Sequence, residues 1–190
     1  MKPVYIFFKE NPGYMHEAIP NYYFYRAADV SAKFLKSIGI EAVGIDLDNT
    51  AVFDMTPTPL PGVKEWLQSL RDAGFKLVFI SNTNNLRAKF ISRKFSIKCF
   101  ALARKPSPKK ILAGLNYTGV SPDKFAFIGD QLFYDIAAAN RAGVVSIKVD
   151  PTSPEILFAS KFRRRREKER EFIKLYKDEY PKMRGLNDEY

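Results

Sequence analysis

The sequence predicts an α/β protein built on a doubly wound, parallel five-stranded sheet. Short runs of β-branched or aromatic residues alternate with longer helical patterns through the middle of the chain, which is typical of stacked βαβ units. The 190 residues are 46% apolar, enough for one sizeable core. We therefore expect one domain with shorter segments at either end.

Each element of the alternation has a local signal. The strands are apolar runs that end at polar or turn residues, and we place them at 42–46, 76–80, 99–102, 125–128 and 145–149. The first helix of the alternation, at 62–73, follows Pro61, stops at Gly74 and has Trp66, Leu67 and Leu70 on one face. Further helices are expected at 85–95, 107–117 and 132–142.

Three parts are expected along the chain. Residues 1–40 form an aromatic-rich extension packed on the core, with the row Tyr22 to Tyr25 and a helix at 29–38. We interpret that row as packing or a lipid-facing lip. The core with the alternating strands and helices spans 41–153. Residues 154–190 form a basic helical extension, whose default interpretation is a solvated helix face although apolar residues recur near helical spacing at Phe158, Phe162, Phe172, Ile173 and Tyr176.

Composition restricts the environment and the partners. The net charge is +10, and a basic block at 161–170 favours an anionic partner, which could be a phospholipid surface, nucleic acid or an acidic protein. The single cysteine, Cys99, excludes an internal disulfide and a thiolate metal site, so we expect it to fill apolar space on a strand. No apolar run approaches the roughly 20 residues that span a bilayer. The run at 4–8 is too short for a signal peptide, and we expect an intracellular, cytoplasmic protein that can be peripheral to a membrane.

Two carboxylates, Asp46 and Asp48, stand where the first buried strand ends. Side chains alternate along an extended segment, so both acids face the same way and one site can hold two acidic groups with different tasks. A polar exit from the strand, followed by an Asx turn, is the alternative.

Suitable polar residues also follow three other strands. Ser81 and Asn82 lead into a helix whose free amides favour phosphate, although Ser81 could be an ordinary N-cap. Lys105 lies between Arg104 and Pro106, where a cation could also be plain surface charge. Asp130 and Asp135 begin the helix after the fourth strand, where acids are common because of the helix dipole.

Taken together, these residues resemble the motifs of the haloacid dehalogenase (HAD) superfamily. The string 46–50 (Asp-Leu-Asp-Asn-Thr) is similar to its first motif, Ser81 to its second, Lys105 to its third, and Asp130 with Asp135 to its fourth, over about 42–149. The phrases beginning at Asp46, Ala103 and Ile128 more narrowly resemble the YqeG-like branch, which is similar to mitochondrial phosphatases acting on phosphatidylglycerophosphate. Ala51 departs from the larger residue expected there, which affects packing only.

The resemblance implies a phosphatase with an aspartyl-phosphate intermediate. Asp46 would be the nucleophile and Asp48 the general acid and base, while Ser81, Asn82 and Lys105 would hold the phosphoryl oxygens. Mg²⁺ would be bound by Asp46, the backbone carbonyl of Asp48 and Asp130. Asp135 and Thr50 would order the surroundings of these ligands.

The spacing of the motifs leaves no room for a cap domain. Asp48 and Gly62 are only 14 positions apart, and 81–105 has room for one helix and one strand. An open site suits a large or membrane-presented phosphate monoester, with the N-terminal aromatics and the basic extension as candidates for contact with an anionic membrane.

Two non-hydrolytic alternatives remain open at this stage. A phospho-receiver domain also places acids at strand ends beside a hydroxyl and a lysine, although the Asp-x-Asp spacing disfavours it. A non-catalytic RNA- or ribosome-associated protein could use Arg163 to Arg166 electrostatically, although no nucleic-acid motif accompanies that block.

Overall fold

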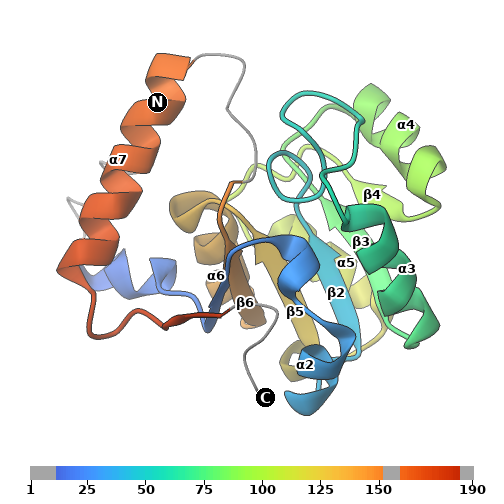
Figure 1. Ribbon diagram of the computed structural model, residues 1–190, viewed down its shortest axis with the longest axis horizontal. Coiled ribbons are helices and arrows are strands. Elements are labelled where there is room, and N and C mark those ends of the chain that lie inside the picture. Colours follow the sequence, from blue (N-terminus) through green and yellow to red (C-terminus); the bar gives the residue numbers. More distant parts are fainter. Residues whose placement is uncertain (1–11, 152–158, 185–190) are drawn as a thin grey trace.

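A computed structural model describes residues 12–151 and 159–184 (Figure 1). The expectations about the run at 4–8 and about Phe158 therefore lie outside the described residues. In chain order the elements are η1 (Pro12–Ala18), β1 (Tyr22–Phe24), η2 (Ala27–Asp29), α2 (Ala32–Ser37), β2 (Ala42–Ile45), α3 (Val63–Asp72), β3 (Lys76–Ile80), α4 (Asn85–Phe95), β4 (Lys98–Phe100), α5 (Lys109–Thr118), η3 (Pro122–Lys124), β5 (Phe125–Gly129), η4 (Leu132–Ile136), α6 (Ala137–Arg141), β6 (Val145–Val149), α7 (Ala159–Leu175) and β7 (Met183–Arg184).

The sheet is parallel and doubly wound, so the predicted class is confirmed. Its strand order is β4-β3-β2-β5-β6-β1-β7, and all neighbouring strands in this order pair in parallel. The chain builds outward from β2 through β3 to β4 and then returns to β5 on the other side of β2. Ligands bind at such a reversal, beyond the carboxyl ends of the strands.

The predicted count of five strands is wrong, because the described sheet has seven. The aromatic row supplies β1, in which Tyr22 pairs with Ile147 and Phe24 with Val149 of β6. The short β7 then pairs with β1. Part of the N-terminal extension is therefore a sheet strand, because its backbone completes the hydrogen bonding of β6, which would otherwise be an edge.

Element boundaries differ from the sequence prediction where local hydrogen bonds decide them. The predicted helix at 29–38 starts later, because Ser31 Oγ caps α2 by accepting from Phe34 N at 3.0 Å. The predicted helix at 132–142 is divided into η4 and α6. In η4 the carbonyl of Gln131 accepts from the amides of both Asp135 and Ile136, a widened turn of the kind often found at functional sites.

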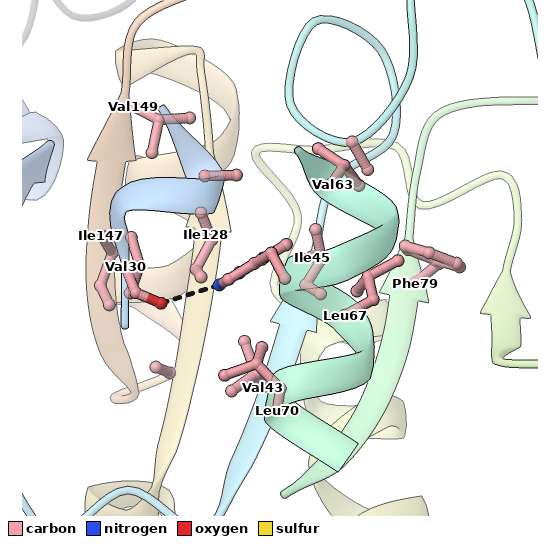
Figure 2. Packing of buried hydrophobic residues seen from close by; sticks show 14 of the residues in the cluster. Val30, Val43, Ile45, Val63, Leu67, Leu70, Phe79, Ile128, Ile147 and Val149 are labelled. Carbon is pink, nitrogen blue, oxygen red and sulfur yellow. Dashed lines mark hydrogen bonds between the residues drawn. The ribbon is translucent and has the colours of Figure 1, made fainter. Parts of the chain in front are cut away.

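The main core lies between α3 and the sheet (Figure 2). Leu67 and Leu70 of α3 face Val43 and Ile45 of β2, and all four side chains are buried. Trp66 Nε1 donates a hydrogen bond to the Val30 carbonyl at 2.8 Å, drawn as the dashed line in Figure 2. That hydrogen bond links the segment before β2 to α3.

The C-terminal helix α7 covers η4 rather than lying free. Phe172 is buried and meets the ring of Phe133 at a centroid distance of 5.5 Å. Tyr176 packs on Phe172 at 4.7 Å. The interpretation of this segment as a solvated face is therefore wrong for the side that carries Phe172. None of the helices within residues 12–151 and 159–184 is long and apolar enough to cross a membrane.

Gly44 lets two aromatic rings pack across the central strand. A Cβ at this position would lie 2.8 Å from the ring of Phe125 and 2.9 Å from that of Phe127, and both rings are fully buried. Only a residue without a side chain permits that approach, and the sequence Ala-Val-Gly-Ile supplies it on β2.

We predict that Gly44→Ala lowers the free energy of unfolding by about 1–3 kcal/mol, because the buried rings must move to admit the methyl group. Urea denaturation of the purified protein measures the change. In the double variant Gly44→Ala/Phe125→Leu, part of the loss should be recovered, since the second substitution removes one of the two rings that clash. An unchanged midpoint in Gly44→Ala would contradict the packing described for this strand.

Candidate active site

The predicted site residues meet at the carboxyl edge of the sheet. Asp46 follows β2, Ser81 follows β3 and Asp130 follows β5, and these three strands are neighbours. The amide of Asp46 donates to the Ile128 carbonyl at 2.9 Å, which continues the pairing of β2 with β5. Lys105 comes from the loop after β4, where its amide donates to Asn82 Oδ1 at 3.0 Å.

A buried ion-pair network joins Lys105 to two of the acids. Its Nζ lies 2.5 Å from Asp46 Oδ1 and 2.5 Å from Asp135 Oδ1, and it also donates to the Ile80 carbonyl at 3.2 Å. Lys105, Asp46 and Asp135 are all almost inaccessible to water. The sequence alone allowed Lys105 to be surface charge, and its burial excludes that interpretation.

Burial and the neighbouring charges shift the pKa of Asp46, Asp135 and Lys105 in this network. Burial raises the pKa of Asp46 well above its usual value, and the charges of Asp135 and Asp130 add to this, while Lys105 opposes it. Burial also raises the pKa of Asp135. Desolvation alone would lower the pKa of Lys105, but Asp135 and Asp46 together raise it, so the lysine stays charged. The site therefore holds more acidic groups than one lysine can neutralise.

The residues present fit a hard divalent cation. One carboxylate oxygen from each of Asp46, Asp130 and Asp135 lies within 4.8 Å of the others. Asp130 Oδ1 is buried and has no hydrogen-bond partner among the described residues, so an electropositive ligand would satisfy it. An all-oxygen donor set is the kind that Mg²⁺ prefers. The third acid of this group is Asp135. The carboxylate of Asp48 is not part of the group, because it faces Arg87.

The Asp48 carboxylate is held by an arginine that sequence reasoning missed. Arg87 of α4 contacts both of its oxygens, at 2.6 and 2.8 Å, and the amide of Met55 donates to Oδ1 at 2.9 Å. Arg87 also donates to the Thr56 carbonyl at 2.7 Å. The pair joins positions 39 residues apart, and no local pattern around Arg87 indicates its partner.

Ser81 and Asn82 directly follow β3, and Thr50 lies in the loop after β2. Ser81 is buried, and its Oγ accepts from Thr83 N at 3.3 Å. The cap of α4 is Asn84, whose Oδ1 accepts from Arg87 N at 2.9 Å, so the N-cap alternative for Ser81 is wrong. Thr50 is buried directly after the two acids.

A second arginine reaches the site from α7. Arg166 is paired with Asp130 Oδ2, donates to the Asp130 carbonyl at 2.9 Å and contacts Glu169 Oε2 at 2.8 Å. Glu169 is buried and accepts from the amide of Leu132 at 2.9 Å. The basic block was visible in the sequence, but its contact with Asp130 was not, because the two lie 36 residues apart.

The close approach of Asp135 to β5 depends on Gly129. A Cβ at that position would lie 2.4 Å from Asp135 Cβ. The amide of Gln131 then donates to Asp135 Oδ2 at 3.0 Å, which orients the carboxylate toward Lys105. The Gly-Asp step at the end of β5 is therefore the sequence signal of this arrangement.

Comparison with known proteins agrees with the geometry. A family model described as haloacid dehalogenase-like hydrolase matches residues 5–143. The chain belongs to the haloacid dehalogenase-like hydrolase family. The matched range contains Asp46, Ser81, Lys105, Asp130 and Asp135.

Two curated proteins and a solved structure illustrate the relationship. The Bacillus subtilis (strain 168) protein named "Probable phosphatase YqeG" is 30% identical over 139 residues, which is 73% of this chain and 81% of that protein. The glyceraldehyde 3-phosphate phosphatase of Methanopyrus kandleri is 31% identical over 48% of this chain and 43% of its own length. The cobalt-bound deoxy-D-mannose-octulosonate 8-phosphate phosphatase YrbI of Haemophilus influenzae is 15% identical, over 60% of this chain and 70% of that one, with a TM-score of 0.49. The family and the relative named YqeG support the prediction of a phosphomonoester hydrolase.

We predict that Arg87→Lys lowers kcat for a soluble aryl phosphate by about 10- to 100-fold with little change in KM. A lysine keeps the charge but cannot contact both oxygens of Asp48, so the carboxylate loses its orientation. Steady-state kinetics at saturating Mg²⁺ provide the measurement.

The matched comparison is the double variant Arg87→Lys/Asp48→Asn. If Arg87 acts through Asp48, the double variant should be no slower than Asp48→Asn alone. Additive losses would show that Arg87 does not act by positioning Asp48.

Proposed function

We propose that the protein is a Mg²⁺-dependent phosphatase that hydrolyses phosphate monoesters through an aspartyl-phosphate at Asp46. The observation that carries the proposal is the buried group of Asp46, Asp130 and Asp135 around Lys105. A structural ion pair does not need three carboxylates within 4.8 Å of one another. A site that binds a divalent cation beside a phosphoryl group does need several carboxylates close together.

The covalent step divides one displacement into two. A carboxylate oxygen of Asp46 forms a bond to phosphorus as the ester oxygen departs, and water later breaks the acyl-phosphate to release phosphate. The contact of Lys105 with Asp46 Oδ1 supports this role, because the lysine holds the nucleophile and lies where a transferring phosphoryl oxygen needs positive charge. Ser81 and Asn82 would hold the remaining oxygens, and the hydrogen bond from the Lys105 amide to Asn82 Oδ1 at 3.0 Å supports this.

Asp48 would be the residue that transfers protons. It would give a proton to the departing alkoxide and later accept one from the attacking water. Support comes from its location two residues after the nucleophile and from its carboxylate being held outside the buried acid group by Arg87. The side chain of Asp48 is 24% exposed and that of Asp46 is 6% exposed, so Asp48 is the acid more open to a leaving group and to water.

The bound Mg²⁺ would supply charge neutralisation for the phosphoryl group. Asp46, Asp130 and the backbone carbonyl of Asp48 would bind it, and the orphaned oxygen of Asp130 supports this assignment. Asp135 would hold Lys105 and the surroundings of Asp130, and Thr50 would order the loop after β2.

A lipid phosphate such as phosphatidylglycerophosphate is the substrate class that we propose. Within the described residues, the segment between β2 and α3 contains only isolated bridges joining Asp48 to Val52 and Val52 to Pro59, and no inserted domain. The segment between β3 and β4 holds α4 alone. Nothing in those two segments encloses a small metabolite, so the site suits a phosphate presented on a large or membrane-bound molecule.

A substrate screen tests the function. We predict Mg²⁺-dependent release of phosphate from an aryl phosphate and faster release from phosphatidylglycerophosphate in anionic vesicles, measured as free inorganic phosphate. Asp46→Asn should abolish both while its circular dichroism spectrum stays that of the wild type, because the nucleophile is lost and the fold is not.

Two results would contradict the proposal. Turnover retained by Asp46→Asn would remove the covalent mechanism. Rapid hydrolysis of soluble phosphates, with none of the lipid, would remove the substrate class but leave the phosphatase.

A further inference from the structure

One region of the chain carries as much net positive charge as the whole protein. Residues 73–122 contain ten lysines and arginines and no aspartate or glutamate. The remaining 140 residues contain 21 cations and 21 acids, so this region accounts for the entire net charge of +10. It holds β3, α4, β4 and α5, of which α4 and the edge strand β4 lie on the side of the molecule opposite α7 in Figure 1.

The outward side of α4 combines these cations with exposed apolar side chains. Leu86 is 82% exposed and Phe90 is 56% exposed, and their spacing places them together on the helix surface. Lys89 and Arg93 flank them and are exposed as well. Single exposed apolar residues need no explanation, but a paired leucine and phenylalanine among cations is a recurrent feature of interfacial helices.

Two loops add further apolar residues near the start of the helix. Met55 is 57% exposed and Leu102 is 47% exposed, and both have left-handed backbones, with φ of 56° and 49°. Large side chains rarely adopt that conformation. Hydrogen bonds hold both loops next to the start of α4. In the first loop, the Thr56 carbonyl, next to Met55, accepts from Arg87 at 2.7 Å. In the second, Leu102 N donates to the Thr83 carbonyl at 2.9 Å.

A groove beside the helix gathers the nearby cations. It has a volume of about 380 Å³ and lies between α4 and β4. Lys89, Arg93 and Lys98 line it together with Ser92 and Asn85. Cations and hydrogen-bond donors next to exposed apolar groups match the phosphate and acyl regions of a lipid surface.

We propose that this surface docks the protein onto an anionic phospholipid bilayer. We call it the α4 face, and it consists of Leu86, Lys89, Phe90, Arg93, Met55 and Leu102. Arg87 of the same helix contacts Asp48, so docking brings the membrane beside the catalytic acids. The docking is independent of turnover, whereas delivery of a lipid phosphate to the site rests on the proposed function.

The location of this proposed membrane-docking surface differs from the one that the sequence suggested. The basic block was the candidate there, but Arg166 pairs with Asp130 and Arg165 lies 4.5 Å over the ring of Tyr134. RNA suits the α4 face less well, because Phe90 is the one aromatic residue among the six that define this face, whereas Leu86, Met55 and Leu102 offer no ring on which a base can stack.

Vesicle sedimentation tests the proposal with the full chain. The probes are vesicles of phosphatidylcholine alone and vesicles of equal parts phosphatidylcholine and phosphatidylglycerol. Two variants alter the α4 face, Leu86→Ser/Phe90→Ser and Lys89→Gln/Arg93→Gln. The matched control, Leu175→Ser/Lys177→Gln, removes an exposed apolar residue and a cation at the end of α7.

We expect the wild type and the control to bind the anionic vesicles and not the neutral ones. Each α4 variant should bind at least about tenfold more weakly, because each removes two membrane contacts. All variants should hydrolyse a soluble aryl phosphate at the wild-type rate, so a loss of binding cannot be attributed to unfolding.

Three outcomes would overturn the proposal. These are no binding to anionic vesicles, binding that the α4 variants leave unchanged, and salt-dependent binding to single-stranded RNA without vesicle binding. A protein that binds vesicles through the α4 face but hydrolyses no phosphate ester would instead refute the proposed function alone.

Discussion

The buried ammonium of Lys105, shared between Asp46 and Asp135, is the interaction on which the site depends. Removing one partner from a buried ion pair leaves an uncompensated charge and costs about 3–5 kcal/mol. Here the lysine has two acids, and Asp130, which Arg166 also contacts, adds a third within 4.8 Å of them, so three acids face two cations. The arrangement is therefore a poor solution for stability alone, and it becomes favourable when a cation joins it.

The sheet topology explains why these groups meet. Because β2 lies between β3 and β5, the residues after three strands project from one edge. Gly44 allows aromatic rings of β5 to pack against β2, and Gly129 allows Asp135 to approach β5. Stability of the sheet and geometry of the acids thus depend on two positions where no side chain fits.

The sequence predicted the parts of this protein that have local signals. The strands at 76–80 and 145–149 and the helix at 85–95 match the structure, and every residue of the acid group was identified. Strand β1 was missed because three aromatic residues become a strand only by pairing with β6, over 120 residues away. The contacts of Arg87 with Asp48 and of Arg166 with Asp130 were missed for the same reason, since only the tertiary structure brings these residues together.

The central claim is that the acid group is a Mg²⁺ site, and the thermal unfolding midpoint with and without Mg²⁺ tests it most directly. Burial raises the pKa of Asp46 in the folded protein above that in the unfolded chain. The metal-free fold therefore loses stability as the pH rises through the raised pKa and Asp46 ionises. Mg²⁺ should therefore raise the midpoint of the wild type more at about pH 8 than at about pH 5, where protons compete for the same oxygens. Asp130→Asn should remove most of this increase. An equal increase in Asp130→Asn, or none in the wild type at either pH, would contradict the account.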